Sequence, residues 1–187
     1  MGLPQDGRNF RRVLGHHPTG VCVVTWMEEA GPVGMVVGSF TSVSLDPPLV
    51  AFLPDRKSTS WPRLEATGRF CVNVLSDRQR ALCTAMSSPA ATRFDGWTYR
   101  RSPGGLPILD GVVAWIDCEL SAVHEAGDHF IAIGRVHALD VESARPPLLF
   151  FQGGYGGFSS LPMDDPQSAP SAVNGATTLP QQSGDPR

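Results

Sequence analysis

VVAWIDCELSAVHEAGDHFIAIGRVHALDV, at residues 112–141, is the stretch that indicates how this chain folds. Within 112–123 every second side chain is apolar, whereas the alternate positions include Trp115, Asp117, Glu119 and Ser121. This period of two is typical of a strand with one buried face and one face half in water. HEAGD at 124–128 predicts a turn, and 129–141 predicts a returning strand that begins apolar on both faces. We therefore expect an antiparallel hairpin with His129 where its second strand starts.

Shorter strands and helices are predicted on both sides of this hairpin. Runs rich in β-branched and aromatic residues predict strands at 20–26, 33–40, 49–54, 69–75 and 147–158. Three short helices are predicted: one after Asp6 with Phe10, Val13 and Leu14 on one face, one at 58–68, and one at 76–87 that opens with a Ser76–Gln79 capping box. Residues 41–48 carry no helical pattern, and the proline- and glycine-rich residues 88–111 predict a long loop.

The order of these elements indicates the fold class. Most predicted strands are neighbours joined by short turns, and strands do not alternate regularly with helices, so a parallel doubly wound sheet is disfavoured. We expect a mainly β protein with flanking helices, built as an antiparallel barrel over residues 1–160. Residues 161–187 hold five prolines and no aromatic residue. We expect them to form a disordered tail, with the alternative that the tail lies over a neighbouring subunit.

Composition disfavours several classes of function. The net charge is −3 and basic residues are scattered, so neither a nucleic acid nor a membrane is an expected partner. No apolar run is long enough to span a bilayer, and the N-terminus lacks the apolar segment of a secretory signal, so we expect a cytoplasmic protein. The four cysteines form no C-x-x-C pair and no histidines pair at i,i+4 on a helix. We therefore expect reduced core thiols and no metal site.

Three polar motifs are candidate ligand sites, each with an ordinary alternative. SFTSVSLDPP at 39–48 is either a polar loop or an edge of hydroxyl and backbone groups for a planar polar ligand such as a flavin ring. DRKSTS at 55–60 is either a phosphate site or a helix cap. TRFDG at 92–96 holds an arginine beside an aromatic residue, which solvated loops also contain. Neither G-x-G-x-x-G nor a P-loop occurs, so a nucleotide would be bound without those phosphate cradles.

Taken in order, segments of this chain resemble the flavin reductase-like family, the small reductase components of two-component flavin-dependent monooxygenases. The segments lie between Phe10 and Phe158 and read PTGVCVVT, GMVVGSFTSVSLDPPLV, STSW, GRFCVNVLSDRQ, RFDG, GDHFIAIGRV and LLFFQGGYG. The resemblance implies a split β-barrel of the FMN-binding type with Greek-key-like connections, assembled as a homodimer with flavin near the subunit interface. It also implies an enzyme that transfers a hydride from NADH, or alternatively NADPH, to FMN or FAD and supplies the reduced flavin to a separate monooxygenase component.

The resemblance further implies roles for individual residues. The isoalloxazine ring would be lined by residues 37–44, with contacts from Val37, Gly38, Ser39, Phe40, Thr41, Ser42 and Ser44. The phosphate or ribityl chain would meet Arg56, Ser58 and Thr59, and the flavin tail would be covered by Arg93 and Phe94. His129 would seat NADH over the flavin face, and Gly154 and Tyr155 would border the nicotinamide site. The ordinary alternative for His129 is a turn histidine bonded to Asp128 or to the backbone.

The His16-His17 pair and Gln152 depart from the family pattern, and two other functions stay open. His16 and His17 stand where relatives usually carry less polar residues, and Gln152 precedes GGYG where an arginine is common. A non-catalytic flavin carrier would use the same barrel without turnover. A flavin oxidase of the pyridoxamine-phosphate type would instead retain its flavin tightly.

Overall fold

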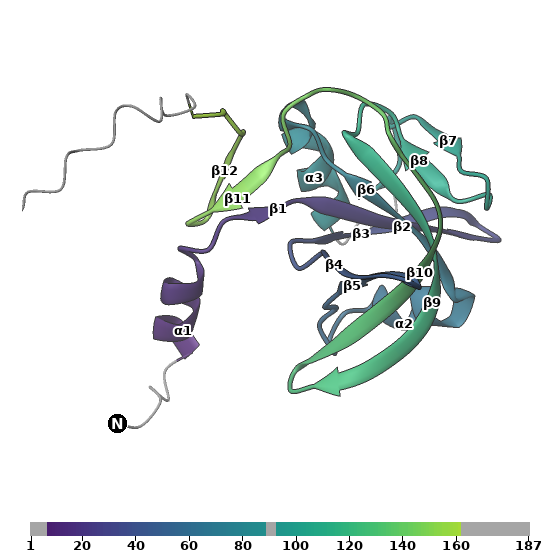
Figure 1. Ribbon diagram of the computed structural model, residues 1–187, viewed down its shortest axis with the longest axis horizontal. Coiled ribbons are helices and arrows are strands. Elements are labelled where there is room, and N and C mark those ends of the chain that lie inside the picture. The colour runs from purple at the N-terminus through teal and green to yellow at the C-terminus, as the bar shows by residue number, and fades with distance from the viewer. Residues whose placement is uncertain (1–6, 89–92, 162–187) are drawn as a thin grey trace, which may run out of the picture.

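Seven antiparallel strands form the main sheet of the computed structural model, which describes residues 7–88 and 93–161 (Figure 1). The strand order is β3-β2-β6-β9-β10-β5-β4. The bounds are β2 Cys22–Glu28, β3 Gly31–Val37, β4 Thr41–Leu45, β5 Pro48–Phe52, β6 Arg69–Val74, β9 Ala114–Ala126 and β10 His129–Val141. The sheet curves into a barrel. The barrel is open, because the edge strands β3 and β4 do not pair with each other within the described ranges. The expected antiparallel, mainly β fold is confirmed.

The β9–β10 hairpin occupies the middle of the sheet. β10 pairs with β9 and β5, and β6 pairs with the other side of β9. β5 and β6 follow each other in the chain but are separated in the sheet by the hairpin, which gives the Greek-key-like order. The turn is shorter than predicted, since β9 extends to Ala126 and only Gly127 and Asp128 join the two strands. Gly127 has a φ of 66°, a conformation that favours glycine.

The polar face of β9 is covered at Trp115 and Asp117, which overturns the prediction of a half-wet strand there, whereas Glu119 and Ser121 are exposed as predicted. Along β2, Val23 packs into a cluster with α3 (Arg80–Ser87) and the 106–109 segment, whereas Val24 packs into a second cluster on the opposite face. Trp115 of β9 joins the first cluster, and Asp117 beside it is only 1% exposed. The covering segment includes strands β7 (Tyr99–Arg101) and β8 (Pro107–Leu109), which pair inside the region predicted to be a long loop.

The helix α2 (Trp61–Thr67) connects β5 to β6 and forms within the predicted range 58–68. Its first turn is capped by Ser58, whose Oγ accepts the N–H groups of Ser60 and Trp61 at 3.3 and 3.2 Å. It ends at Gly68, which has a φ of 67°. The indole of Trp61 is buried and stacks on Phe130 of β10 with ring centroids 5.8 Å apart. This packing fixes α2 against the hairpin.

The other two predicted helices also form. Residues 76–87 give a 3₁₀ turn, η1 (Asp77–Gln79), followed by α3, and the Ser76 N–H donates to Gln79 Oε1 at 2.9 Å as the capping box predicts. The first helix, α1 (Gly7–Leu14), stands away from the barrel in Figure 1 and has no buried residue. Its apolar face is therefore exposed, with Phe10 63% accessible. None of the helices in the described part of the chain has the length and apolar character needed to cross a membrane.

Two further differences from the sequence predictions lie at chain segments rich in glycine or hydroxyl residues. The predicted strand 147–158 is two short strands, β11 (Leu149–Phe151) and β12 (Gly154–Gly156), which form a small sheet with β1 (Thr19–Gly20). Gln152 and Gly153 turn the chain between them with φ values of 49° and 80°. Residues 41–45, which showed no clear pattern, pair with β5 as strand β4. Apart from Leu161, the predicted tail lies outside the described residues.

Candidate functional site

A groove with a volume of about 910 Å³ lies between α1 and one end of the barrel. The barrel contributes the end of β3, the segment after β5 and the start of β10. Its lining residues are Gly7, Phe10, Arg11, Leu14, Gly15, His17, Thr19, Met35, Val36, Val37, Gly38, Ser39, Leu53, Pro54, Asp55, Ser58, Asp128, His129 and Phe150. The volume falls within the range typical of small-molecule sites. The groove therefore brings together five of the predicted site residues: Val37, Gly38, Ser39, Ser58 and His129.

The first wall of the groove is the chain that leaves β3. Val37 is buried and Gly38 is exposed. A Cβ at Gly38 would lie 3.1 Å from Thr19 Oγ1, so the position requires a small residue. The Ser39 hydroxyl accepts the backbone N–H of Leu53 at 2.9 Å, and this bond ties the chain after β3 to the chain after β5. The wall thus presents backbone and hydroxyl groups beside the apolar Met35.

The start of β10 contributes the histidine. His129 Nδ1 lies 2.8 Å from Asp128 Oδ1, and the imidazole side chain is 40% exposed. The hydrogen bond with His129, followed by the charge of that imidazole, lowers the pKa of the Asp128 carboxyl. Because an ionised carboxylate only accepts hydrogen bonds, Nδ1 carries a proton, and Nε2 is the ring nitrogen left for a ligand. The ordinary alternative of a bond to Asp128 is therefore present in the structure, on a histidine that also lines the groove.

The predicted phosphate residues separate in the structure. Asp55 to Ser58 form a turn in which the Ser58 N–H donates to the Asp55 carbonyl at 2.9 Å. The Ser58 Oγ accepts two backbone N–H groups of α2, which leaves its own proton as the one donor of that hydroxyl. Arg56 instead forms an ion pair with Glu125 at 3.2 Å. Only Ser58 of the three predicted phosphate residues lines the groove.

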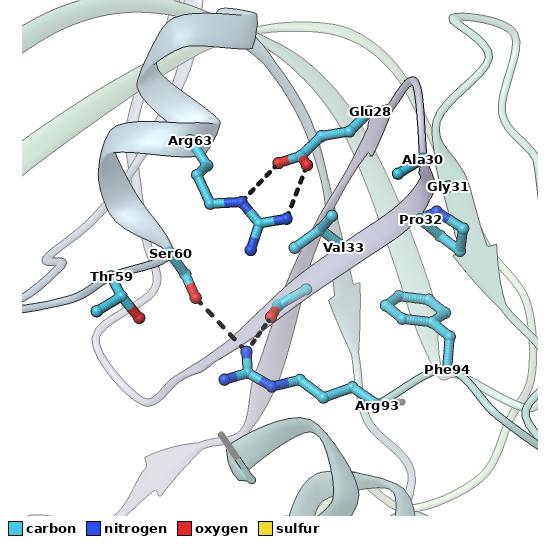
Figure 2. Close-up of a pocket in the computed structure, with 11 residues that line it drawn as sticks. Glu28, Ala30, Gly31, Pro32, Val33, Thr59, Ser60, Arg63, Arg93 and Phe94 are labelled. Carbon is cyan, nitrogen blue, oxygen red and sulfur yellow. Dashed lines mark hydrogen bonds and ion pairs between the residues drawn. The ribbon is translucent and has the colours of Figure 1, made fainter. Parts of the chain in front are cut away.

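A second, smaller pocket contains Thr59 and the predicted flavin-tail residues Arg93 and Phe94 (Figure 2). Its volume is about 360 Å³, and α2 and the β2–β3 hairpin form its sides. The Arg93 guanidinium donates to the Gly34 carbonyl at 2.9 Å and to Ser60 Oγ at 3.5 Å. Arg63 forks onto the Glu28 carboxylate at 2.9 and 2.7 Å. The consecutive residues Ser58 and Thr59 contribute to the groove and to this pocket respectively, so the two cavities lie beside the same short segment.

The remaining predicted site residues lie outside both cavities. Phe40 packs against the buried cluster that contains Trp26, and Thr41, Ser42 and Ser44 lie on the edge strand β4. The Tyr155 hydroxyl lies 3.4 Å from Cys83 Sγ, and Gly154 precedes it on β12. The hydrogen bond with Cys83, followed by burial, raises the pKa of Tyr155. The Tyr155 ring packs edge-on against that of Phe150, a groove residue, with ring centroids 5.4 Å apart.

Several groove residues were not predicted from the sequence as site residues. Thr19, Met35, Leu53, Pro54, Asp55 and Phe150 line the groove. The Leu53-Pro54 pair that ends the predicted strand 49–54 was an available signal, since strand ends commonly border sites. The two departures from the family pattern also lie close by. His17 lines the groove, whereas Gln152 donates its backbone N–H to the Gly15 carbonyl at 3.0 Å at the base of α1.

An open antiparallel barrel whose end carries a groove of backbone, hydroxyl and histidine groups defines a small β-barrel protein with a candidate site for a small, partly polar molecule. Sequence comparison identifies the protein family within this class. The chain belongs to the flavin reductase-like family, because a sequence model described as the Flavin reductase like domain matches residues 14–159.

Individual relatives support the family assignment. A flavin reductase from Pseudomonas putida is 60% identical over 157 residues, which cover 83% of this chain and 92% of that protein. The reductase subunit HsaB of a flavin-dependent monooxygenase from Rhodococcus jostii (strain RHA1) is 45% identical over 152 residues, 81% of this chain and 78% of that protein. The solved structure of the NADH:FAD oxidoreductase SgcE6 from Streptomyces globisporus, in complex with NAD and FAD fragments, has a TM-score of 0.80 at 35% identity and covers 88% of this chain and 99% of its own.

Proposed function

We propose that this chain is an NADH-dependent flavin reductase that transfers a hydride from NADH to FMN or FAD. The reduced flavin then leaves for a separate monooxygenase component. The observation that carries the proposal is the 910 Å³ groove, which combines an oriented histidine with backbone and hydroxyl groups in a chain of the flavin reductase-like family. Relatives named as NADH-dependent FMN reductases and as monooxygenase reductase subunits support the reaction and the kind of partner.

The residues of the groove suit a flavin ring beside a nicotinamide ring. When both are bound, the nicotinamide supplies a hydride at C4 and the flavin accepts it at N5. The protein then has to hold the two rings at contact distance and in register, which is catalysis by positioning. Val37, Gly38 and Ser39 form the wall for the flavin ring. The Ser58 hydroxyl donates toward the ribityl or phosphate chain, and Arg56 is left out of this set because Glu125 already engages it.

His129 takes the nicotinamide side of the groove. Asp128 Oδ1 accepts the Nδ1 proton, so Nε2 is the ring nitrogen that would bond the carboxamide of NADH. We expect His129→Ala to lower kcat/KM for NADH by about tenfold, the worth of one hydrogen bond. Flavin affinity should change by less than about twofold, because the residues proposed for the flavin ring, Val37, Gly38 and Ser39, lie on a different chain segment. Equal losses in reduction rate and flavin affinity would contradict this role.

We assign the smaller pocket of Arg93 and Phe94 to the flavin tail. Its position beside Ser58 and Thr59 supports this, because the tail of FAD continues from the phosphate. The assignment expects Arg93→Ala to weaken binding of FAD more than binding of FMN. Fluorescence titration of both flavins against the variant measures the two affinities. A parallel loss for FMN and FAD would remove the pocket from the site.

The functional unit that we propose is a homodimer. The apolar face of α1, formed by Phe10, Val13 and Leu14, is exposed beside the groove, and Phe151 and Phe158 are exposed at the β11–β12 end. Exposed apolar side chains of this kind favour burial against a second copy. Size-exclusion chromatography with light scattering should give twice the chain mass, and Phe10→Asp should shift the mass toward the monomer. A wild-type monomer would refute the dimer.

We also place the protein in the cytoplasm and its catalytic domain at residues 1–160. All four cysteines are buried free thiols, which suits a reducing compartment. Deletion of residues 161–187 is expected to leave NADH oxidation within about twofold of wild type, since every groove residue precedes them. Loss of the dimer on deletion would assign the tail a structural role.

One assay tests the activity and separates it from the alternatives. Purified protein is mixed with NADH or NADPH and excess FMN or FAD, and the nicotinamide absorbance is followed. Catalytic loss of NADH supports the reductase. Bound flavin without turnover would support a carrier, and a flavin retained through purification that oxidises a substrate directly would support an oxidase.

A further inference from the structure

The tip of the β9–β10 hairpin, residues 125–130, is held by the segment that follows β5. The Phe130 N–H donates to the Pro54 carbonyl at 2.9 Å, and the Arg56 N–H donates to the Asp128 carbonyl at 3.0 Å. Asp55 and His129 face each other as an isolated antiparallel bridge between these two bonds. The backbone of His129 is therefore set by the 54–56 segment as well as by its own strand.

The side chain of Arg56 adds a second connection to the same tip. Its guanidinium forks onto Glu125 at 3.2 and 3.4 Å and reaches the Gly127 carbonyl at 3.5 Å. The guanidinium carbon also lies 5.2 Å from the centroid of the Phe130 ring. These contacts fall on both sides of the two-residue turn, so one side chain spans the turn that carries His129.

We propose that Arg56 is a positioning residue that fixes the hairpin tip and so holds His129 on the groove. A two-residue turn at the end of two 13-residue strands is a place where local opening costs little. Arg56 and Glu125 are 43% and 73% exposed, so their ion pair contributes little to global stability. The effect of the ion pair is local. The forked bonds to Glu125 and the contact with the Phe130 ring fix both the distance and the orientation of the hairpin tip relative to Arg56.

This inference rests on the proposed reductase function for its kinetic readout, but its structural readout is independent. Hydrogen exchange of the free protein, without flavin or nucleotide, reports the clamp through the Phe130 amide. Arg56→Ala and Glu125→Gln should each speed exchange of that amide by about fivefold or more, while core amides of β6 keep their protection. Unchanged exchange in both variants would overturn the clamp whether or not the protein is a reductase.

Kinetics then separate a clamp from a phosphate contact. A clamp predicts that Arg56→Ala and Glu125→Gln lower kcat/KM for NADH alike, by about three- to tenfold, with unchanged affinity for FMN and for riboflavin. A phosphate contact predicts weaker FMN binding in Arg56→Ala, unchanged riboflavin binding, and no effect of Glu125→Gln; that pattern would overturn the proposal. Arg56→Lys, which keeps the charge without the fork, should recover activity only in part.

The matched control is another exposed arginine–glutamate pair. Arg100 and Glu142 are 2.5 Å apart and lie outside both cavities, so Glu142→Gln should change neither exchange at the tip nor NADH kinetics. A comparable loss in this control would mean that any broken surface pair has the effect, and the specific role of Arg56 would fail. Absence of NADH oxidation in the wild type, with faster tip exchange in the variants, would overturn the reductase function and leave the clamp standing.

Discussion

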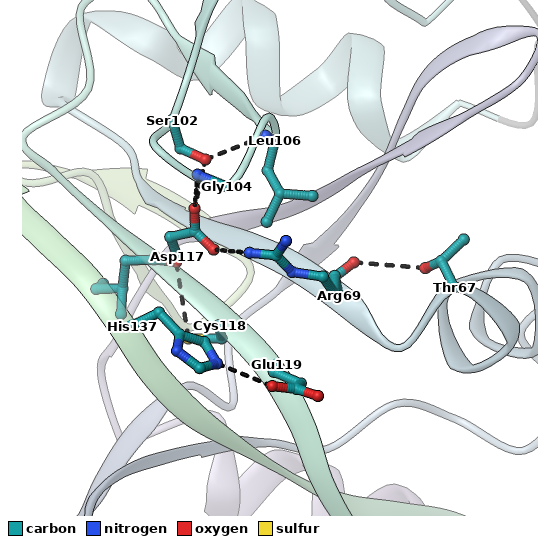
Figure 3. Close-up of polar contacts among 10 residues, drawn as sticks. Thr67, Arg69, Ser102, Gly104, Leu106, Asp117, Cys118, Glu119 and His137 are labelled. Carbon is teal, nitrogen blue, oxygen red and sulfur yellow. Dashed lines mark hydrogen bonds and ion pairs between the residues drawn. The ribbon is translucent and has the colours of Figure 1, made fainter.

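Replacement of Asp117 by asparagine should destabilise the protein by about 3 kcal/mol. Figure 3 shows this buried carboxylate on β9, where Oδ2 accepts the Ser102 hydroxyl at 2.5 Å and the Gly104 N–H at 2.8 Å, and Oδ1 accepts from Arg69 at 3.3 Å. Hydrogen bonds to a charged acceptor contribute about 1.5–3 kcal/mol each, against about 1 kcal/mol for a neutral acceptor. Asparagine keeps one acceptor oxygen for Ser102 and Gly104 but turns an amide donor toward the guanidinium. The losses therefore come to about 1 kcal/mol at each of the three contacts.

Thermal and urea denaturation measure this change. For a domain of this size, about 3 kcal/mol corresponds to a fall in melting temperature of about 6–12 °C. NADH oxidation at 20 °C should stay within about twofold of wild type, because position 117 lies about 30 Å along β9 from the hairpin tip. Gly104 is packed closely against this carboxylate, since a Cβ there would lie 2.4 Å from Asp117 Oδ2.

A control on the same strand tests the reasoning about burial. Glu119 pairs with His137 at 3.0 Å, but these side chains are 59% and 43% exposed. Glu119→Gln should cost at most about 0.5 kcal/mol, as solvated pairs do. If Asp117→Asn is no more destabilising than Glu119→Gln, the buried network does not hold the 102–106 segment and the estimate from charged hydrogen bonds is refuted.

Other substitutions and reagents probe the core and the second pocket. Gly134→Ala should destabilise by about 2–3 kcal/mol in urea, because its Cβ would lie 2.4 Å from Phe70 Cζ; near-wild-type stability would mean that the ring moves freely. The hydrogen bonds from Arg63 lower the pKa of Glu28 in the folded protein. The contribution of this ion pair to the free energy of unfolding is therefore fully present above the pKa of the carboxyl in the unfolded chain, and it is lost as pH falls through the lowered pKa of the folded state. The stability difference between wild type and Glu28→Gln, about 1 kcal/mol at neutral pH, should shrink over that window, and a difference that persists in acid would exclude the ion pair as its source. Burial raises the pKa of the Cys22 and Cys118 thiols to about 12. Native protein at pH 8 should therefore resist a disulfide reagent that labels all four cysteines once the protein is unfolded in urea. Rapid labelling of the native protein would contradict the buried placement of the thiols.

The central hairpin could be predicted because its pattern is local. The period of two over 112–123 and the glycine of the turn specify two strands whatever surrounds them. The burial of Trp115 and Asp117 could not be predicted in the same way. It depends on the 102–109 segment, whose prolines and glycines predict a loop although its residues Pro107–Leu109 form a strand over that face. A pattern that is polar on one side cannot distinguish water from a buried polar network.

The groove was predicted less completely, because a sequence motif gives the order of its residues but does not show which of their side chains face the same cavity. Residues 37–44 look like one polar site in the sequence. The strand pairing of 41–45 with β5 instead separates Thr41, Ser42 and Ser44 from Val37, Gly38 and Ser39. Arg56 looks like a phosphate ligand from its neighbours in the chain. Its actual partner, Glu125, is 69 residues away and was not marked by any local signal.

The placement of the groove bears on how a flavin is held and released. Its barrel walls come from three chain segments that are joined to one another by few bonds, chiefly the Ser39–Leu53 hydrogen bond and the contacts of the hairpin tip. No lysine or arginine other than Arg11 lines the groove in the described ranges, so a phosphate there would meet mostly hydroxyl and backbone donors. Such donors form weaker bonds to a phosphate than a forked arginine does. A reductase that passes flavin to another enzyme needs this modest affinity together with a rigid nicotinamide site. In the function proposed above, the His129 end of the groove would be that site, and the clamp proposed for Arg56 would keep it rigid.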